Sequence, residues 1–359
     1  MNSPTNSRGT FTHGDLDPEK DGCPVRDCKE TLSATPYRGK PIPWCSSHGL
    51  RLHGKPGSRR TFVYVNGPDS QHDSLIRNFP IERAFLEKHS LRELEKAETH
   101  RLGYENAEDA LTWNVFAGLL AAGALRRAAE ALTGRTVDGD PELWLWGHRV
   151  DLKEGFGPLF PPLARVRKRL EPDVHPFSTE PDIMLMIPGK LLVLIEAKFT
   201  SGNSLAIEKE AKDGEKPKTL KGLLKKYLPE ATDPGAVIPS RVSNPFHGQL
   251  FRNIVFAQAM AREPEMAGAD WAVINLVSDT QRNLAVRVLS PTLGEPITSF
   301  NDPTPAVHSW LKEKDRPRFR FSSWEKLHAG VIKGHSKLGA VDAYLRGKSA
   351  HLKPAFNLA

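Results

Sequence analysis

Apolar and polar positions alternate with two different periods along the chain, which predicts a fold containing both helices and strands. Apolar side chains recur every three or four residues over 81–101 and again over about 106–133, so both stretches are predicted to be helical. The second helix is expected to begin with Asn106 as its N-cap and Asp109 as the capping-box partner.

The strongest strand signal is a pair of apolar segments, Ile183–Ile187 and Leu191–Phe199, separated by a turn-like Pro188-Gly189-Lys190. Further elements are expected as strands at 143–152, 271–277 and 284–289, and as helices from Asn244-Pro245 to about Arg262 and within 305–350. This order of elements predicts an α/β sandwich in which helices flank a mixed central sheet.

Composition divides the chain into three parts. Residues 1–20 are rich in Ser, Thr, Asn, Gly and Asp, which predicts a disordered leader. Residues 21–57 hold all the cysteines among many Gly, Pro and Arg, which predicts a small loop-rich module that needs a staple to fold. Residues 81–350 are expected to form the main domain, with a polar, Lys-rich insertion or mobile loop at about 200–243.

The composition excludes two classes of protein. No apolar run approaches the ~18 residues of a membrane helix, and the first 30 residues lack a secretory apolar segment, so we expect a cytoplasmic protein without a membrane partner. Three cysteines within 359 residues are too few for a secreted disulfide scaffold, which favours a metal site for them. A net charge of +7 permits a polyanionic partner.

Two carboxylates and one amine are predicted to meet at the end of the central hairpin. If the turn occupies 188–190, Asp182 lies opposite Glu196, and directly opposed hairpin residues lie side by side on one face. Lys198 is two residues further along the strand and shares that face. Because burying two like charges is costly, we expect Mg²⁺ or Mn²⁺ to bind between the carboxylates.

The run Pro181-Asp182, followed after 13 residues by Glu196-Ala197-Lys198, resembles the signature of the PD-(D/E)xK phosphodiesterases. The resemblance covers roughly residues 100–290 and implies the restriction-endonuclease-like fold. It also implies a Mg²⁺-dependent nuclease that cleaves DNA, in restriction, phage defence or repair. The resemblance implies that Asp182 and Glu196 hold the metal together with the Ala197 carbonyl, and that Lys198 orients the attacking water.

The resemblance also implies an acidic residue on the helix before the sheet, as a further metal ligand. Glu108 stands in that place, and Glu105 and Asp109 are competitors. A first-turn carboxylate that complements the helix dipole is the structural alternative for Glu108.

Many members of the family carry a polar residue on the helix that follows the catalytic lysine strand. Gln249 matches that position, with Arg252 and Asn253 on the same helix face at i+3 and i+4. The gap of about 45 residues between Lys198 and this helix is longer than a minimal core needs, so it stays open whether Gln249 is the residue equivalent to the family's polar residue. His247 is a further residue worth testing near this site.

The cysteines have the spacing of a zinc site. Cys23-x4-Cys28, sixteen residues and then Cys45-x2-His48 supply the four ligands of tetrahedral Zn²⁺, with His53 as an alternative fourth ligand. The pattern resembles small zinc knuckles that accompany nuclease domains in bacterial and phage proteins. No His-Asn-His set follows, so we expect a structural site rather than an HNH catalytic centre.

Basic residues follow the cysteine module and recur elsewhere, with a second run at 165–169. The residues expected to contact nucleic-acid phosphates are Arg51, Lys55, Arg59, Arg60 and Arg252. Protein partners from a defence or mobile-element system are an alternative use of the module. The alternative function for the whole chain is a non-catalytic nucleic-acid-binding or assembly protein that keeps the nuclease fold.

Overall fold

The computed structural model describes residues 20–37, 40–53, 61–63, 107–172, 179–200, 226–227, 229–231, 235–242, 247–281, 286–289, 296–299, 302–352 and 355–358, together with Asp15, Asp17 and Asn203. These residues belong to two compact units. The first comprises 1–122, 152–155 and 332–359, and the second comprises 123–151 and 156–331. The helix predicted over 81–101 lies outside the described residues.

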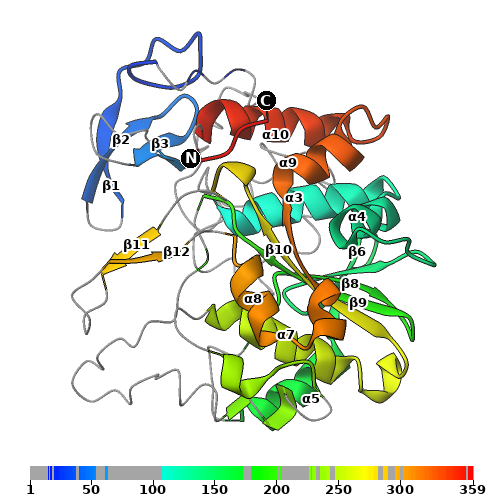
Figure 1. The fold of residues 1–359 in the computed structure, drawn as a ribbon. Helices are drawn as coiled ribbons and strands as arrows, with labels where there is room; N and C mark the ends of the chain where they lie inside the picture. The colour runs from blue at the N-terminus through cyan, green and yellow to red at the C-terminus, as the bar shows by residue number, and fades with distance from the viewer. Residues whose placement is uncertain are drawn as a thin grey trace. The chain divides into compact units, whose positions relative to one another are not determined.

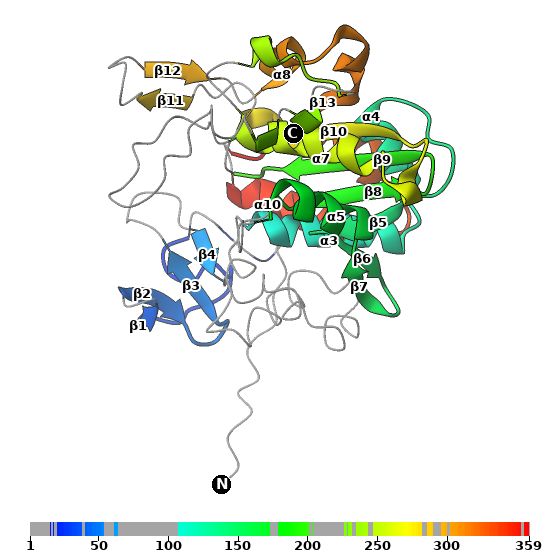
Figure 2. The same ribbon diagram turned by 90° about the horizontal axis from the view of Figure 1, so that it is seen from below.

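The second unit is built on a seven-stranded sheet with the spatial order β13-β10-β9-β8-β5-β6-β7 (Figures 1 and 2). The strands are β5 (Glu142–Leu145), β6 (His148–Asp151), β7 (Gly155–Leu159), β8 (Ile183–Ile187), β9 (Leu191–Ala197), β10 (Asp270–Val277) and β13 (Phe319–Ser323). β9 pairs antiparallel with β8 and parallel with β10, which also pairs parallel with β13. The predicted mixed α/β class is therefore confirmed.

The central hairpin has the predicted register. Ile187 pairs with Leu191 and Ile183 with Ile195, so Asp182 lies just beyond the last pair, beside Glu196. Gly189 occupies the turn with φ +65°, a left-handed conformation that a side chain would strain. The β8 and β9 residues are all buried, as expected of strands that helices cover on both faces.

Helices lie against both faces of this sheet (Figures 1 and 2). The helices on one face are α5 (Pro161–Leu170), α7 (Gly248–Met260) and α8 (Thr304–Trp310), and those on the other are α4 (Leu125–Thr133) and α9 (Trp324–Leu327). The even-numbered residues Leu192 and Leu194 of β9 share one apolar cluster with α5 and α7. Since successive strand residues alternate between faces, Glu196 belongs to the face that α7 covers.

Two predicted elements are interrupted in the structure. The helix predicted over 106–133 is two helices, α3 (Glu108–Ala121) and α4, because Gly123 takes a left-handed φ of +69° between them. The N-cap of α3 is Ala107 without a side-chain hydrogen bond, so the capping box predicted around Asn106 is wrong. The strand predicted over 143–152 is the hairpin β5–β6, which turns at Trp146 (φ 53°) and Gly147.

Other strands were missed or pair differently. β13 was not predicted as a strand, although it forms one edge of the described sheet. The strand predicted at 284–289 is β11 (Val286–Leu289), which pairs with β12 (Pro296–Ser299) in a separate two-stranded sheet. Short helical turns cover Pro239–Arg241, Pro264–Met266, Asp279–Gln281, Glu313–Arg318 and, as a π-helix, His328–Ile332.

The second half of the predicted insertion is packed where the structure describes it. Tyr227, Ala231 and Val237 are buried members of the same apolar cluster as α5 and α7. Val237 also forms a β-bridge with Leu311, and Ile238 N donates to the Trp310 carbonyl at 2.7 Å. These residues therefore belong to the core of the second unit and not to a loose loop.

The first unit contains a four-stranded antiparallel sheet with the order β1-β2-β3-β4, together with α3 and α10 (Gly339–Leu352). The strands are β1 (Ser33–Tyr37), β2 (Lys40–Cys45), β3 (Leu50–His53) and β4 (Thr61–Val63). The cysteine module thus carries more regular structure than the predicted loop-rich unit. None of the helices in the described part of the chain has the length and apolar character needed to cross a membrane.

Candidate functional site

Glu196 and Lys198 form a buried ion pair at the end of β9. The Lys198 Nζ atom lies 2.7 Å from Glu196 Oε1, and the two side chains are only 10% and 4% exposed. Their spacing of two residues places both on one face of the strand, as the sequence predicted. A buried charge pair is stable only when further hydrogen bonds satisfy it, which the surrounding polar residues provide.

Asp182 is the residue directly before β8 and lies beside this pair. Its Oδ2 accepts a hydrogen bond from the Ala197 backbone N–H at 2.9 Å, and its carbonyl accepts one from Trp146 N at 3.2 Å. The Asp182 carboxylate therefore lies against the backbone residue that links Glu196 to Lys198. All three sequence-predicted residues meet at the same end of the hairpin.

The strand end that carries this site is fixed by an amide pair. Asn203 and Asn275 donate to each other at 2.9 and 3.0 Å, and Asn275 also donates to the Glu196 carbonyl at 3.5 Å. The Lys198 carbonyl accepts from Trp324 Nε1 at 2.9 Å. Because all of these groups are buried, their satisfied hydrogen bonds hold β9 in one arrangement.

Asn253 is the residue of α7 that contacts the site. Its Nδ2 donates to Glu196 Oε2 at 2.8 Å, so both oxygens of that carboxylate are hydrogen-bonded. Gln249 lies one turn earlier on α7 and Arg252 is half-buried beside Asn253. The helical spacing of four from Gln249 was visible in the sequence, but the pairing of Asn253 with Glu196 was not.

We expect Asn253→Ala to destabilise the protein by about 2 kcal/mol, because a hydrogen bond to a buried charged group is lost. The neighbouring substitution Arg252→Ala, at a half-buried position of the same helix, is expected to cost about 0.5 kcal/mol or less. Urea unfolding of both variants measures the difference. Equal losses in the two variants would contradict the assignment of this contact to Asn253.

His247 precedes α7 and is neutral because it is buried. It is 4% exposed, its Nδ1 has no hydrogen-bond partner among the residues that the structure describes, and burial lowers its pKa from 6.5 to about 4. The unfolded chain takes up a proton as pH falls through about 6.5, whereas the folded protein does so only near 4. The stability that this group contributes is therefore present above pH 6.5 and lost as the pH falls.

As the pH falls from 6.5 to about 4, we expect His247 alone to lower the free energy of unfolding by about 3 kcal/mol. His247→Asn cannot titrate there, so this part of the slope should disappear. Urea unfolding at several pH values between 4 and 7 measures the slope in both proteins. If the free energy of unfolding changes with pH to the same extent in both proteins, His247 does not cause the slope.

Glu108 is the first residue of α3, in the first unit, and Asp109 follows it. Both lie in the first turn, where a carboxylate complements the helix dipole. Glu105 lies outside the described residues. The role of Glu108 as a metal ligand stays a prediction.

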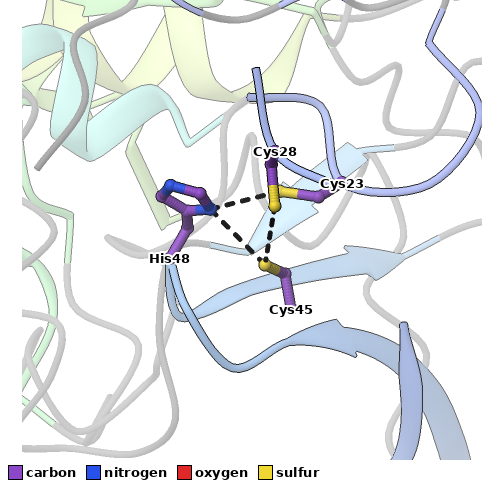
Figure 3. Close-up of side chains that lie close together, drawn as sticks. All are labelled: Cys23, Cys28, Cys45 and His48. Carbon is purple, nitrogen blue, oxygen red and sulfur yellow. Dashed lines mark hydrogen bonds between the residues drawn. The ribbon is translucent and has the colours of Figure 1, made fainter. Parts of the chain in front are cut away.

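Three cysteines and one histidine come together in the module of the first unit (Figure 3). His48 Nδ1 lies 3.5 Å from both Cys23 Sγ and Cys45 Sγ, and Cys28 Sγ lies 3.8 Å from Cys45 Sγ. A tetrahedral Zn²⁺ with Zn–S of about 2.3 Å and Zn–N of about 2.05 Å has edges of about 3.6 Å between S and N and about 3.8 Å between two sulfurs. The donor atoms therefore fit zinc.

The same cysteines are free thiols, and the separation of 3.8 Å is too long for a disulfide. Burial raises the pKa of Cys23 and of Cys45, so a metal that binds them would have to displace the protons of both thiols. Among the residues that the structure describes, this is the one group of three or more candidate ligands that come within reach of a single ion. The four ligands predicted from sequence are the four that the structure brings together.

Lys20 and Glu30 organise the loops that carry the ligands, and sequence analysis named neither. Lys20 Nζ donates to the carbonyls of Val25, Arg26 and Cys28 at 2.7, 2.8 and 2.6 Å. Glu30 accepts from the Ser46 hydroxyl and from Ser47 N, and these bonds lower its pKa to about 2. Lys20 closes the predicted leader, so at least this residue is tied to the module.

The residues predicted to contact nucleic acid have different environments. Arg51 is 6% exposed, and its guanidinium lies 5.8 Å from the Trp44 ring, which does not favour a phosphate contact. Lys55, Arg59 and Arg60 lie outside the described residues. In the basic run of α5, Arg165 and Arg169 form ion pairs with Glu263, so that run is at least partly neutralised within the unit.

Comparison of the chain with models of protein families, with curated proteins and with solved structures found no match.

Proposed function

We propose that the chain is a metal-dependent nuclease of the PD-(D/E)xK type, with the restriction-endonuclease-like fold in its second unit. The observation that carries the proposal is the buried Glu196–Lys198 pair with the Asp182 carboxylate held against Ala197 N. A lone surface ion pair would be exposed and contribute little. Here the charged groups are enclosed at the end of a central strand, where a purely structural role is better served by apolar side chains.

The donor set suits a hard divalent cation. Asp182 and Glu196 supply carboxylate oxygens from adjacent strand ends, and Mg²⁺ in proteins commonly takes one or two carboxylates and keeps several waters. Such an ion, when bound, lowers the pKa of a coordinated water and neutralises charge on a phosphoryl group. Glu108 is proposed as a further acidic ligand, as the family resemblance implies.

The remaining chemistry is assigned to the chain itself. Lys198 carries a cationic Nζ that can orient the attacking water and stabilise the negative charge that develops on the phosphate. The water oxygen bonds to phosphorus in line with the bond to the 3′ oxygen, which breaks. The water gives up its proton to the solvent, and the departing 3′ oxygen takes a proton from the solvent. Asn253 and the Asn203–Asn275 pair keep Glu196 and its strand in place during this reaction. DNA is the proposed substrate.

We propose that the module of the first unit binds one structural Zn²⁺ through Cys23, Cys28, Cys45 and His48. In the part of the module that the structure describes, the apolar cluster is small and comprises Cys23, Val25, Cys45, Leu50 and Leu52, with Cys28 and Leu32 packed against it. A cluster of this size cannot supply the folding free energy of an independent unit, whereas a structural zinc can.

The test of the nuclease proposal is a supercoiled-plasmid assay with Mg²⁺, Mn²⁺ or Ca²⁺. We expect cleavage by the wild type with Mg²⁺ or Mn²⁺, and a loss of about a hundredfold or more in Asp182→Asn. The control is Asp138→Asn, which removes a carboxylate that is 88% exposed and pairs with Lys190. Absence of wild-type cleavage on plasmid and on single-stranded DNA with each metal would overturn the proposal.

One observation favours the second candidate, a non-catalytic nucleic-acid-binding or assembly protein with the same fold. Both Glu196 oxygens already accept hydrogen bonds from Lys198 and Asn253, which satisfies the carboxylate without a metal. This candidate predicts salt-dependent DNA binding that is unchanged in Asp182→Asn, with no cleavage by either protein.

A further inference from the structure

A buried hydrogen-bond cluster joins the end of α5 to the segment that delivers Asp182. Glu171, the C-cap residue that follows α5, accepts from Thr179 N at 2.6 Å and from the Thr179 hydroxyl. Arg167 Nε donates to the Thr179 carbonyl at 2.8 Å. The backbone N–H, the hydroxyl and the carbonyl of one residue are therefore all held by α5.

The third donor to Glu171 comes from the sequence insertion. Tyr227 OH donates to Glu171 Oε1 at 2.6 Å, and Glu171, Thr179 and Tyr227 are 5%, 5% and 3% exposed. Burial raises the pKa of Tyr227, so its hydroxyl remains a donor at physiological pH. A carboxylate in this environment is tolerated only because three donors satisfy it.

Thr179 lies three residues before Asp182, and both ends of this short link are fixed. Asp182 is held at the other end through Ala197 N and Trp146 N. Between them, Pro181 restricts its own φ and the conformation of Glu180. The chain between Thr179 and Asp182 therefore has little freedom to adjust, and a displacement of Thr179 is expected to displace Asp182 as well.

We propose that Glu171 is a positioning residue for Asp182, and that the docking of Tyr227 onto Glu171 couples the insertion to the metal-binding end of the hairpin. The role assigned to Asp182 rests on the proposed function, whereas the mechanical link does not. The insertion thereby contributes to the site without supplying a ligand. The Tyr227 hydroxyl completes the set of donors to the Glu171 carboxylate, which holds Thr179 and, through it, the carboxylate of Asp182.

The test compares two threonines that each lose one buried hydroxyl hydrogen bond. Thr179→Val removes the hydroxyl bond to Glu171 and keeps the bond from the Thr179 backbone N–H, and the control Thr133→Val removes a hydroxyl bond of 2.7 Å to the Ala129 carbonyl in α4. Tyr227→Phe removes the donor from the insertion alone. Amide hydrogen exchange is followed at Ala197, whose N–H is bonded to Asp182, and at Lys198, whose N–H is bonded to the Leu276 carbonyl.

Each of Thr179→Val and Tyr227→Phe removes one hydrogen bond to the Glu171 carboxylate. Because a bond to a charged group is lost, we expect the exchange rate of the Ala197 amide, divided by that of the Lys198 amide, to rise about tenfold. In Thr133→Val that ratio should stay as in the wild type. Equal ratios in all variants would overturn the proposal, because a merely structural role would accelerate both amides together.

Cleavage provides the second measurement, on the full-length protein. We expect the Mg²⁺ concentration for half-maximal cleavage to rise about tenfold in Thr179→Val and Tyr227→Phe, and not in Thr133→Val. A wild type that cleaves nothing would refute the proposed function while leaving the exchange result to decide the mechanical link. Unchanged Mg²⁺ dependence in active variants would show that the link does not serve the metal site.

Discussion

Lys198→Met is expected to lower the rate of Mg²⁺-dependent cleavage about a thousandfold, because the cationic group that orients the attacking water is removed. The same change leaves Glu196 buried without its cationic partner, and we expect a destabilisation of about 3 kcal/mol. The plasmid assay and urea unfolding measure the two effects separately.

A double variant separates catalysis from folding. Glu196→Gln together with Lys198→Met removes both charges, so most of the lost stability should return while cleavage stays absent. The control is Lys190→Met, which breaks an exposed pair with Asp138 and is expected to cost about 0.5 kcal/mol without loss of cleavage. Cleavage that recovers in the double variant along with stability would show that Glu196 and Lys198 act only on the fold.

Substitution of one zinc ligand is expected to unfold the module of the first unit. Cys45→Ser or His48→Ala should reduce bound zinc from about one ion per chain to nearly none, since structural zinc supplies the folding free energy of such a module. Elemental analysis after dialysis, and amide exchange of residues 20–53, measure the two effects.

The control for these variants is a substitution of His53, the alternative fourth ligand predicted from the sequence. His53→Ala should retain zinc, because His48 Nδ1 is the nitrogen that lies among the sulfurs. Zinc retained in His48→Ala and lost in His53→Ala would reverse the assignment. A Cys45→Ser protein that keeps both zinc and amide protection would refute a structural zinc at this position.

The predictions that agree with the structure concern short stretches of chain. The register of β8 and β9 follows from a tight turn at Gly189, and that register alone brings Asp182 beside Glu196. The spacing of the cysteines and His48 restricts the module in the same local way. The long helix predicted over 106–133 failed because its pattern of apolar residues continues through Gly123, where the backbone turns.

Contacts between distant segments could not be predicted in this way. Asn253 and Glu196 are 57 residues apart in sequence, and Asn203 and Asn275 are 72 apart. Their meeting depends on how α7 and β10 pack against β9. No local pattern of polar residues distinguishes Asn253 from its neighbours Gln249 and Arg252 before that packing is known.

The amino-acid sequence by itself determined the hairpin, the two carboxylates and the lysine at its end, and the four candidate zinc ligands, since turn geometry and residue spacing act over a few positions. Only the tertiary structure decided that Lys198 and Asn253 each bond one oxygen of Glu196, and that Glu171 and Tyr227 fix the approach to Asp182. The physical reason is that burial and hydrogen-bond partners depend on which helices cover a strand, and that is a property of the whole packed unit.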